Sequence, residues 1–392
     1  MKKILFLTLL LWVSATVQAQ IDSLSMKLDS LLQHPMFETS QVGLMVYDLT
    51  ADTVVYQKNH RQLMRPASCM KLVTAITALD CLGGDYEYKT RIYYTGEVRD
   101  NVLTGNIYCV GGFDPTLTAD DVAVMAESVR NLGIDSISGS IIGDRTMKET
   151  LDYGEGWCWD DDNPMLIPLT IGRKDIFLQT FLRELKRQGV RTGGITMLHS
   201  GITPANARLV SIFRHSIDTV LERMMKVSDN FYAESMLYQT AATTGRKLAK
   251  SSDAHSITKQ LVKKVGLGNN PYKFADGSGL SLYNYVSAEL LVALLRYAYS
   301  KPDIRGHLMN ALPIASVDGT LKDRMKKTAA AGNVFAKTGT LTGISSLAGY
   351  CTAPNGHKLC FAIINQGIMR TQTGRNFQDH VCQLLCEINY SH

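Results

Sequence analysis

Three short polar clusters constrain this chain most, because each lies beside a different kind of predicted secondary structure. Ser68-Cys69-Met70-Lys71 opens an apolar helical pattern, Ser228-Asp229-Asn230 follows an amphipathic one, and Lys337-Thr338-Gly339-Thr340 lies in a strand-like run. Each cluster alone has an ordinary structural explanation. All three, in this order and on these elements, rarely occur together by chance, so we expect the fold to bring them to one reactive hydroxyl.

The composition is that of a globular protein. Of 392 residues, 45% are hydrophobic and 20% are charged, with 31 Gly and 10 Pro. At about 100–200 residues per domain, this length predicts two or three domains. The formal charge is +5, and without Lys2 and Lys3, which lie in a segment that we expect to be removed, it is 5 − 2 = +3. So small an excess does not indicate a nucleic-acid partner.

The first 19 residues have the pattern of a secretory signal peptide. Lys2 and Lys3 precede an apolar stretch over 4–13, and small residues lead to a cleavage site after Ala19. A transmembrane anchor is the alternative, but it needs about 20 apolar residues. No cysteine follows the cleavage point, so no lipid attachment is indicated. We expect a periplasmic protein with no integral membrane segment once the signal is removed.

Ser68 and Lys71 lie where we expect a helix to begin. Pro66 precedes them, apolar residues follow at helical spacing to Leu79, and Gly83 lies just past the end. A spacing of three places the hydroxyl and the amine on one helix face. The partial positive charge at the helix N-terminus stabilises an attacking alkoxide and, with burial, lowers the pKa of the lysine.

The spacing alone is not specific. Ser256 and Lys259 repeat it inside a continuing helix, where a solvated pair is the ordinary explanation. Ser228, Asp229 and Asn230 offer a hydroxyl and an amide to one cleft, but the same three residue types also favour a helix N-cap.

The third cluster lies in a predicted strand over 334–341. Alternation places Lys337 and Gly339 on one face, and Gly allows a bound substrate to approach the strand. The lysine supplies positive charge, and the hydroxyls of Thr338 and Thr340 can bind a carboxylate. An ordinary polar strand end is the alternative.

The element pattern indicates an α+β fold with an antiparallel sheet against a helical cluster. The region over 85–168 has its own strands and a capped helix, and we expect it to be a small inserted α+β domain. The main domain would then comprise 20–84 and 169–392. Helices are expected over 23–33, 176–188, 217–225, 230–242, 256–265 and 288–299, strands over 334–364, and a last helix around 377–388.

Export makes disulfides possible among the eight cysteines, which are too sparse for a disulfide scaffold. Asn355-Gly356 signals a two-residue hairpin turn. With that turn, Cys351 faces Cys360, which makes this pair a candidate bridge, although Pro354 weakens the register. Cys382 and Cys386, four apart on a predicted helix, read as core packing.

Taken together, the motifs resemble those of the low-molecular-mass penicillin-binding proteins of the D-alanyl-D-alanine carboxypeptidase/endopeptidase type. The resemblance covers nearly the whole mature chain. It also includes Gly156-Trp157-Cys158-Trp159-Asp160-Asp161, Asp276-Gly277-Ser278-Gly279-Leu280-Ser281, Leu312-Pro313 and Asp318-Gly319-Thr320-Leu321. Many members have two nested insertions before the second motif, whereas the gap here is 228 − 71 = 157 residues, so we expect a shortened member with one inserted domain. Cys69 beside the serine is a departure from the pattern.

The resemblance implies a penicillin-recognising transpeptidase/β-lactamase-like fold and a serine carboxypeptidase or endopeptidase acting on peptidoglycan stem peptides, with β-lactams as covalent inhibitors and no cofactor or metal. It implies a role for each site residue. Ser68 would be the acylated nucleophile, Lys71 its general base, Ser228 the proton relay to the leaving D-alanine, Asn230 the holder of the substrate backbone, and Lys337 the source of positive charge. Thr338 and Thr340 would bind the terminal carboxylate beside Gly339, and the N–H groups of Ser68 and Thr340 would hold the oxyanion.

The acidic stretch around Asp161 fits the family's placement of an acidic residue that binds the ammonium of a diaminopimelate side chain; a solvated acidic turn is the alternative. A β-lactamase, a non-hydrolytic penicillin sensor and a surface adhesin remain as other functions. The deacylation motif Glu-x-x-Leu-Asn of class A β-lactamases is absent, and the sequence does not separate carboxypeptidase from endopeptidase activity.

Overall fold

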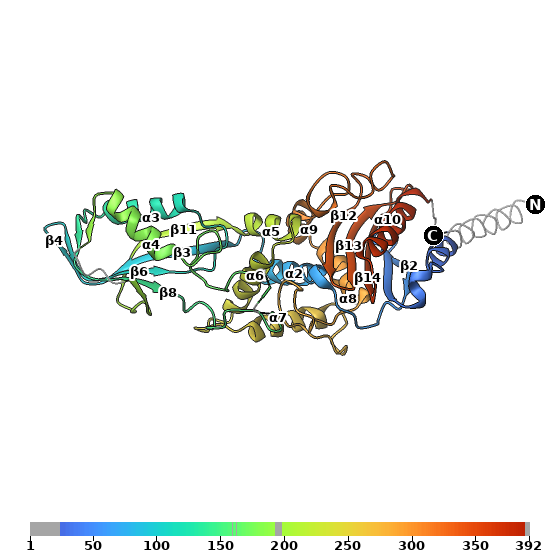
Figure 1. The fold of residues 1–392 in the computed structure, drawn as a ribbon, viewed down its shortest axis with the longest axis horizontal. Coiled ribbons are helices and arrows are strands. Elements are labelled where there is room, and N and C mark those ends of the chain that lie inside the picture. Colours follow the sequence, from blue (N-terminus) through green and yellow to red (C-terminus); the bar gives the residue numbers. More distant parts are fainter. Residues whose placement is uncertain (1–23, 159, 162, 193–197, 389–392) are drawn as a thin grey trace, which may run out of the picture. The chain divides into compact units, whose positions relative to one another are not determined.

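The computed structural model describes residues 24–158, 160–161, 163–192 and 198–388 (Figure 1). The predicted signal peptide over 1–19, and Trp159 and Asp162 of the acidic stretch, lie outside the described residues. The chain divides into two compact units. The first comprises the described residues within Met1–Ile76, Glu222–Asp229 and Lys259–His392, and the second comprises Thr77–Leu221 and Asn230–Thr258.

The first unit is built on an antiparallel five-stranded sheet in the order β12-β13-β14-β1-β2. Its central strands read as nearly continuous apolar runs because both faces of the sheet are covered. Strand bounds are Gln41–Asp48 (β1), Thr53–Lys58 (β2), Phe335–Leu341 (β12), Ile344–Thr352 (β13) and Lys358–Gln366 (β14).

Helices cover the two faces of this sheet. α10 (Thr371–Glu387) packs along one face, as Figure 1 shows in red, and shares a core with a helix over 24–31 through residues such as Phe377, Val381 and Leu28. α8 (Ala288–Ser300) packs against β14 and β1, and Tyr350 Oη donates to its Leu295 carbonyl at 2.8 Å. α9 (Pro302–Ala311) follows. This packing leaves β12 at the edge of the sheet, where its outer backbone groups can meet another strand.

The second unit contains a five-stranded sheet in the order β10-β8-β6-β3-β11 and a smaller one in the order β4-β5-β7-β9. Helices α3 and α4 pack onto the larger sheet through one apolar core. The bounds are Glu87–Tyr94 (β3), Glu97–Arg99 (β4), Val102–Thr104 (β5), Ile107–Val110 (β6), Ala119–Arg130 (α3), Ser136–Ile137 (β7), Ile141–Asp144 (β8), Phe177–Arg187 (α4), Arg191–Thr192 (β9), Leu198–Ser200 (β10) and Arg208–Ser216 (β11).

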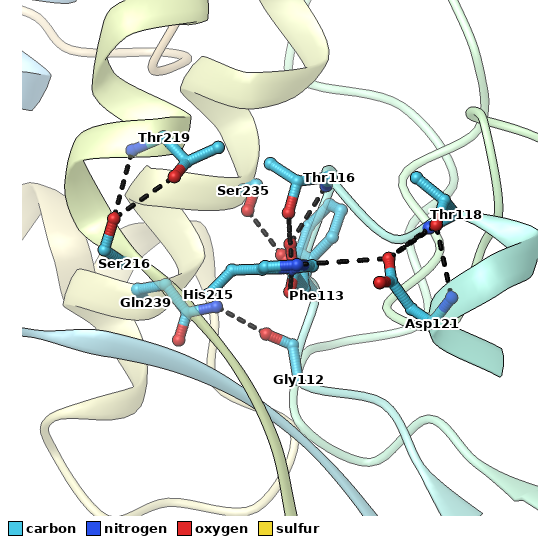
Figure 2. Close-up of polar contacts among 11 residues, drawn as sticks. Gly112, Phe113, Thr116, Thr118, Asp121, His215, Ser216, Thr219, Ser235 and Gln239 are labelled. Carbon is cyan, nitrogen blue, oxygen red and sulfur yellow. Dashed lines mark hydrogen bonds and ion pairs between the residues drawn. The ribbon is translucent and has the colours of Figure 1, made fainter. Parts of the chain in front are cut away.

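Three helices connect to the polar clusters. α5 is Ile217–Lys226, α6 is Asn230–Ala242 and α7 is Ser251–Lys264. The buried loop before α3 is tied to α6, because Gln239 Nε2 donates to Gly112 O at 2.5 Å and Ser235 Oγ donates to Phe113 O (Figure 2). Burial on almost every side explains why α6 shows no amphipathic stripe.

The larger sheet extends past residue 168, where we expected the inserted domain to end. β11 pairs antiparallel with β3 along Arg208–Ser216, and β10 pairs parallel with β8. These are pairings between distant segments that local patterns do not reveal. We propose that the insertion runs from about residue 85 through Ser216.

The expected pairing of Cys351 with Cys360 is wrong. In the β13–β14 ladder Cys351 faces Leu359 and Tyr350 faces Cys360, one position away from the expected register. The loop spans residues 353–357, with Ala353 N donating to His357 O at 2.9 Å, so it is longer than the two-residue turn that Asn355-Gly356 suggested. A shift by one residue places the two side chains on opposite faces, and both thiols are free.

Candidate active site

Ser68 lies in a short 3-10 turn, η2 (Ala67–Cys69), directly before α2 (Met70–Leu82). The turn is closed by Cys69 N, which donates to Pro66 O at 3.2 Å. Ala67 has a positive φ of 47°, a conformation that costs energy for a residue with a side chain. The proline and the turn hold the serine at the helix N-terminus, as the sequence predicted.

Lys71 is fully buried and directs its amine at the serine. Its Nζ donates to Ser68 Oγ at 2.9 Å and to the Ser278 carbonyl at 2.8 Å. A general base must lie within hydrogen-bonding distance of the proton that it accepts. The contact between Lys71 Nζ and Ser68 Oγ meets this requirement, and the neutral amine can accept the serine proton.

The loop that carries Ser278 is held by a buried carboxylate. Asp276 accepts hydrogen bonds from Gly279 N, Ser281 N, Ser278 Oγ and Asn284 Nδ2, between 2.7 and 2.9 Å. Sequence reasoning recognised this block only through the family resemblance and assigned it no role. The structure shows that it positions a carbonyl against Lys71, a contact that leaves no side-chain signal.

Ser228 and Lys337 form a second hydroxyl–amine pair. Lys337 Nζ donates to Ser228 Oγ at 2.9 Å and to Thr338 O at 2.8 Å. Ser228 has a positive φ of 65°, which is a further strained backbone position. The segment is anchored on both sides, because Arg223 pairs with Asp229 at 3.0 Å and Lys226 donates to Asp318 at 2.5 Å.

The charge of Lys71 influences the pKa of Lys337. Burial, as the larger cause, and the nearby positive charge of Lys71 together lower the pKa of Lys337 to about 7. Cys69 lies beside both, fully buried, and burial raises the pKa of its thiol. It is therefore a neutral group, and its Sγ donates to Lys337 O at 3.2 Å.

Gly339 makes room for the turn that carries the serine. A Cβ on Gly339 would meet Ser346 Oγ at 2.2 Å, Pro66 O at 2.7 Å and Cys69 N at 3.0 Å. As the alternation predicted, Lys337 and Gly339 share the buried face of β12, and Thr338 and Thr340 share the other. The glycine serves the approach of η2, a role that the sequence analysis had given to a bound substrate.

A cavity of about 550 Å³ lies over these residues. It is lined by Ser68, Ser228, Thr320, Thr338, Thr340 and Arg375 among others. Thr338 Oγ1 donates to Thr320 Oγ1 at 2.8 Å. All these residues belong to the first unit, so the structure brings seven of the predicted site residues together there: Ser68, Lys71, Ser228, Lys337, Thr338, Gly339 and Thr340.

Asn230 and Asp161 belong to the second unit. Asn230 begins α6, and its Nδ2 donates to Asn163 Oδ1 at 3.2 Å. Asp161 accepts from the N–H of Cys158 at 2.8 Å and closes a turn. The second pair with the same spacing, Ser256 and Lys259, has an ordinary structural role. Ser256 Oγ donates to Ser252 O at 2.8 Å, and Lys259 is exposed.

The chain is similar to several known proteins in sequence and in fold. The chain is 27% identical to a D-alanyl-D-alanine carboxypeptidase from an Actinomadura species, over 89% of this chain and 82% of that one. The structure is similar to penicillin binding protein 4 (dacB) from Haemophilus influenzae, with a TM-score of 0.79 and 23% identity, covering 90% of this chain and 97% of that one. That protein has also been solved in complex with a β-lactam. A predatory peptidoglycan endopeptidase from Bdellovibrio bacteriovorus has a TM-score of 0.59 at 15% identity, covering 88% of this chain and 92% of that one.

The antiparallel sheet, the serine at a helix N-terminus and the paired lysine define a serine enzyme with a penicillin-recognising fold. The chain matches the D-Ala-D-Ala carboxypeptidase 3 (S13) family over residues 24–169 and 171–388. It belongs to that family, and it is a serine-type D-Ala-D-Ala carboxypeptidase. No helix in the described residues is long and apolar enough to cross a membrane.

Proposed function

We propose that Ser68 is the nucleophile and Lys71 its general base in the removal of a terminal D-alanine from peptidoglycan stem peptides. The observation that carries this proposal is the pair of hydroxyl–amine hydrogen bonds, Ser68 with Lys71 and Ser228 with Lys337, beside one cavity. A peptide carbonyl needs both an activated nucleophile and a preorganised oxyanion site.

In the proposed reaction, Ser68 Oγ attacks the carbonyl carbon of the penultimate D-alanine while its proton passes to Lys71. The C–N bond then breaks, and Ser228 relays the proton that Lys71 took up to the amine of the departing D-alanine. Water attacks the resulting ester, which releases the shortened peptide and restores the serine. The backbone N–H groups of Ser68 and Thr340 would bind the oxyanion, each donor contributing about 3–4 kcal/mol.

We further propose that Thr338 and Thr340 bind the terminal carboxylate of the substrate, that Lys337 supplies positive charge beside Ser228, and that Asn230 holds the substrate backbone. Thr338 and Thr340 share the less buried face of β12 and line the cavity. Because β12 is an edge strand, its backbone can also pair with an extended peptide.

The decisive assay measures D-alanine released from an acylated peptide ending in D-Ala-D-Ala. We expect release by the wild type and none by Ser68→Ala. A sensor or adhesin would release no D-alanine, and a β-lactamase would instead hydrolyse penicillin repeatedly within minutes. Mass analysis of muropeptides after incubation with purified sacculi then separates trimming of termini from cutting of cross-links.

For Asp161 we propose contact with the ammonium of a diaminopimelate side chain. The carboxylate is partly exposed although it also accepts the Cys158 N–H. We expect Asp161→Ala to lower kcat/KM for diaminopimelate-bearing peptides and to leave simpler peptides unaffected. If the ratio of kcat/KM for the two peptides is unchanged, Asp161 only stabilises the turn.

We also propose that the chain is exported to the periplasm and cleaved after Ala19. N-terminal sequencing of the protein recovered from a periplasmic fraction tests this proposal. The expected first residue is Gln20, and recovery of Met1 or of a cytoplasmic product would contradict it.

A further inference from the structure

Arg375, on the first turns of α10, brings a cation to the carboxylate end of the cavity. Its guanidinium lines the same cavity as Ser68, Ser228 and Thr340. Its Nη2 lies 3.5 Å from Thr340 Oγ1. None of the three sequence motifs includes this residue, and the sequence analysis did not single it out.

Some charged side chains around the cavity form ion pairs with a neighbour, and Arg375, among the described residues, does not. Arg324 is neutralised by Asp379, with Nη2 and Oδ1 2.6 Å apart, and Asp323 is paired with Lys326 at 2.7 Å. In the part of the chain that the structure describes, Arg375 forms no ion pair. The guanidinium has five N–H donors, and its single side-chain hydrogen bond, to Thr340, is long. The cavity therefore keeps a cation that no protein carboxylate compensates.

The backbone that carries Arg375 is fixed. Arg324 Nη2 donates to the Arg375 carbonyl at 3.2 Å and to Gln378 Oε1 at 3.1 Å, and its pairing with Asp379 secures the next turn of α10. Arg324, with 12% of its side chain exposed, is thus used to anchor the helix. Arg375, one turn earlier than Asp379, projects from a rigid base toward the cavity, as a preorganised binding group must.

We propose that Arg375 determines specificity for a free carboxylate, binding one carboxylate oxygen of the substrate or β-lactam while Thr340 binds the other. This inference rests on the proposed function, in which Thr338 and Thr340 receive that carboxylate. The rigid guanidinium has N–H donors on three nitrogens, so it can bind a carboxylate oxygen and keep its contact with Thr340, which the single amine of a lysine reproduces only in part.

The test is the second-order rate of acylation by benzylpenicillin, which carries a carboxylate, compared with its methyl ester, which does not. We expect Arg375→Gln to lower the rate for the acid 10- to 100-fold and to change the rate for the ester by less than twofold. Arg375→Lys should recover part of the loss. Arg370→Gln removes the same charge from an exposed position just before α10 and should change neither rate.

An equal loss for acid and ester would overturn the proposal, because it would show that Arg375 supports the fold or the serine and not the carboxylate. An unchanged acid rate in Arg375→Gln would also overturn it. A different experiment tests the proposed function, which fails if penicillin labelling persists in Ser68→Ala. The role of Arg375 is measured in a protein that keeps Ser68, as the ratio of the acylation rates for the acid and the ester.

Discussion

Lys337 Nζ donates a 2.9 Å hydrogen bond to Ser228 Oγ, joining residues 109 positions apart. Lys337 is fully buried on β12, and the charge of Lys71 also acts on it. Two amines close together in a buried site cannot both be protonated without cost. Burial and the neighbouring charge therefore lower the pH at which Lys337 loses its proton.

This relationship predicts a pH dependence for acylation. The pKa of Lys337 is lowered to about 7, so its amine is protonated below that value and neutral above it. We expect the second-order rate of acylation by benzylpenicillin to decline as the pH rises through about 7, because the positive charge that Lys337 supplies beside Ser228 is lost. In Lys337→Met that alkaline limb should disappear. If Lys337→Met shows the same decline of the acylation rate at the same pH, a group other than Lys337 causes it.

Removal of the other amine should abolish activation of the serine. We expect Lys71→Met to lower the acylation rate by about 10²- to 10⁴-fold, the usual contribution of a general base. Methionine fills the buried volume without an amine, so circular dichroism should be unchanged. Lys259→Met, from the exposed pair on α7, is the matched control and should keep the wild-type rate. A fully active Lys71→Met protein would contradict the assigned base.

Gly339→Ala should displace the serine turn. The added Cβ would lie 2.7 Å from Pro66 O and 2.2 Å from Ser346 Oγ, and overpacking of this kind costs about 1–3 kcal/mol. We expect a lower free energy of unfolding together with slower acylation, measured by urea denaturation and penicillin labelling. Gly306→Ala on α9, where a Cβ would meet no atom within 4 Å, should be neutral or stabilising by about 0.5–1 kcal/mol. Equal behaviour of the two variants would refute the steric argument.

His215 should make the stability of the second unit depend on pH. Its Nδ1 lies 2.7 Å from Oδ2 of the buried Asp114, Thr116 Oγ1 lies 2.7 Å from the same nitrogen, and Asp121 lies 3.9 Å from Nε2 (Figure 2). The hydrogen bond with Asp114 raises the pKa of His215 above 6.5 although burial opposes it. Because the folded-state pKa is raised, the stabilisation is complete below the unfolded value and is lost as the pH rises through the folded one.

Urea denaturation of the wild type and of His215→Gln at several pH values tests this effect. The wild type should lose stability as the pH rises from about 6 toward 8, the range in which a histidine with a raised pKa loses its proton, and the variant should lose less. If the stability of the two proteins changes with pH in the same way, the His215–Asp114 contact does not cause the pH dependence.

The sequence predicted local elements well where local patterns determine them. α6 has the expected bounds, Asn230–Ala242, and α3 begins with a cap, as expected, which the structure shows to be a capping box of Thr118 and Asp121. The grouping of Ser68, Lys71, Ser228 and Lys337 was also predicted, because each motif lies on an element type that constrains its side chains. The register of Cys351 was wrong, since a five-residue loop holding Pro354 took the place of a two-residue turn.

Other features had no local signal. The contact of Lys71 with the Ser278 carbonyl uses a backbone atom, and the position of Arg375 depends on how α10 packs on the sheet. Pairing of β10 and β11 with the strands of the insertion joins segments far apart in the chain, which periodicity does not specify.

Labelling by a fluorescent penicillin, read on denaturing gels for wild type, Ser68→Ala and Ser256→Ala, tests the central claim most directly. Both serines stand three positions before a lysine, but only Ser68 receives a lysine hydrogen bond, at 2.9 Å. We expect covalent labelling of the wild type and of Ser256→Ala, and none of Ser68→Ala at unchanged circular dichroism. Covalent labelling that persists in Ser68→Ala would contradict it.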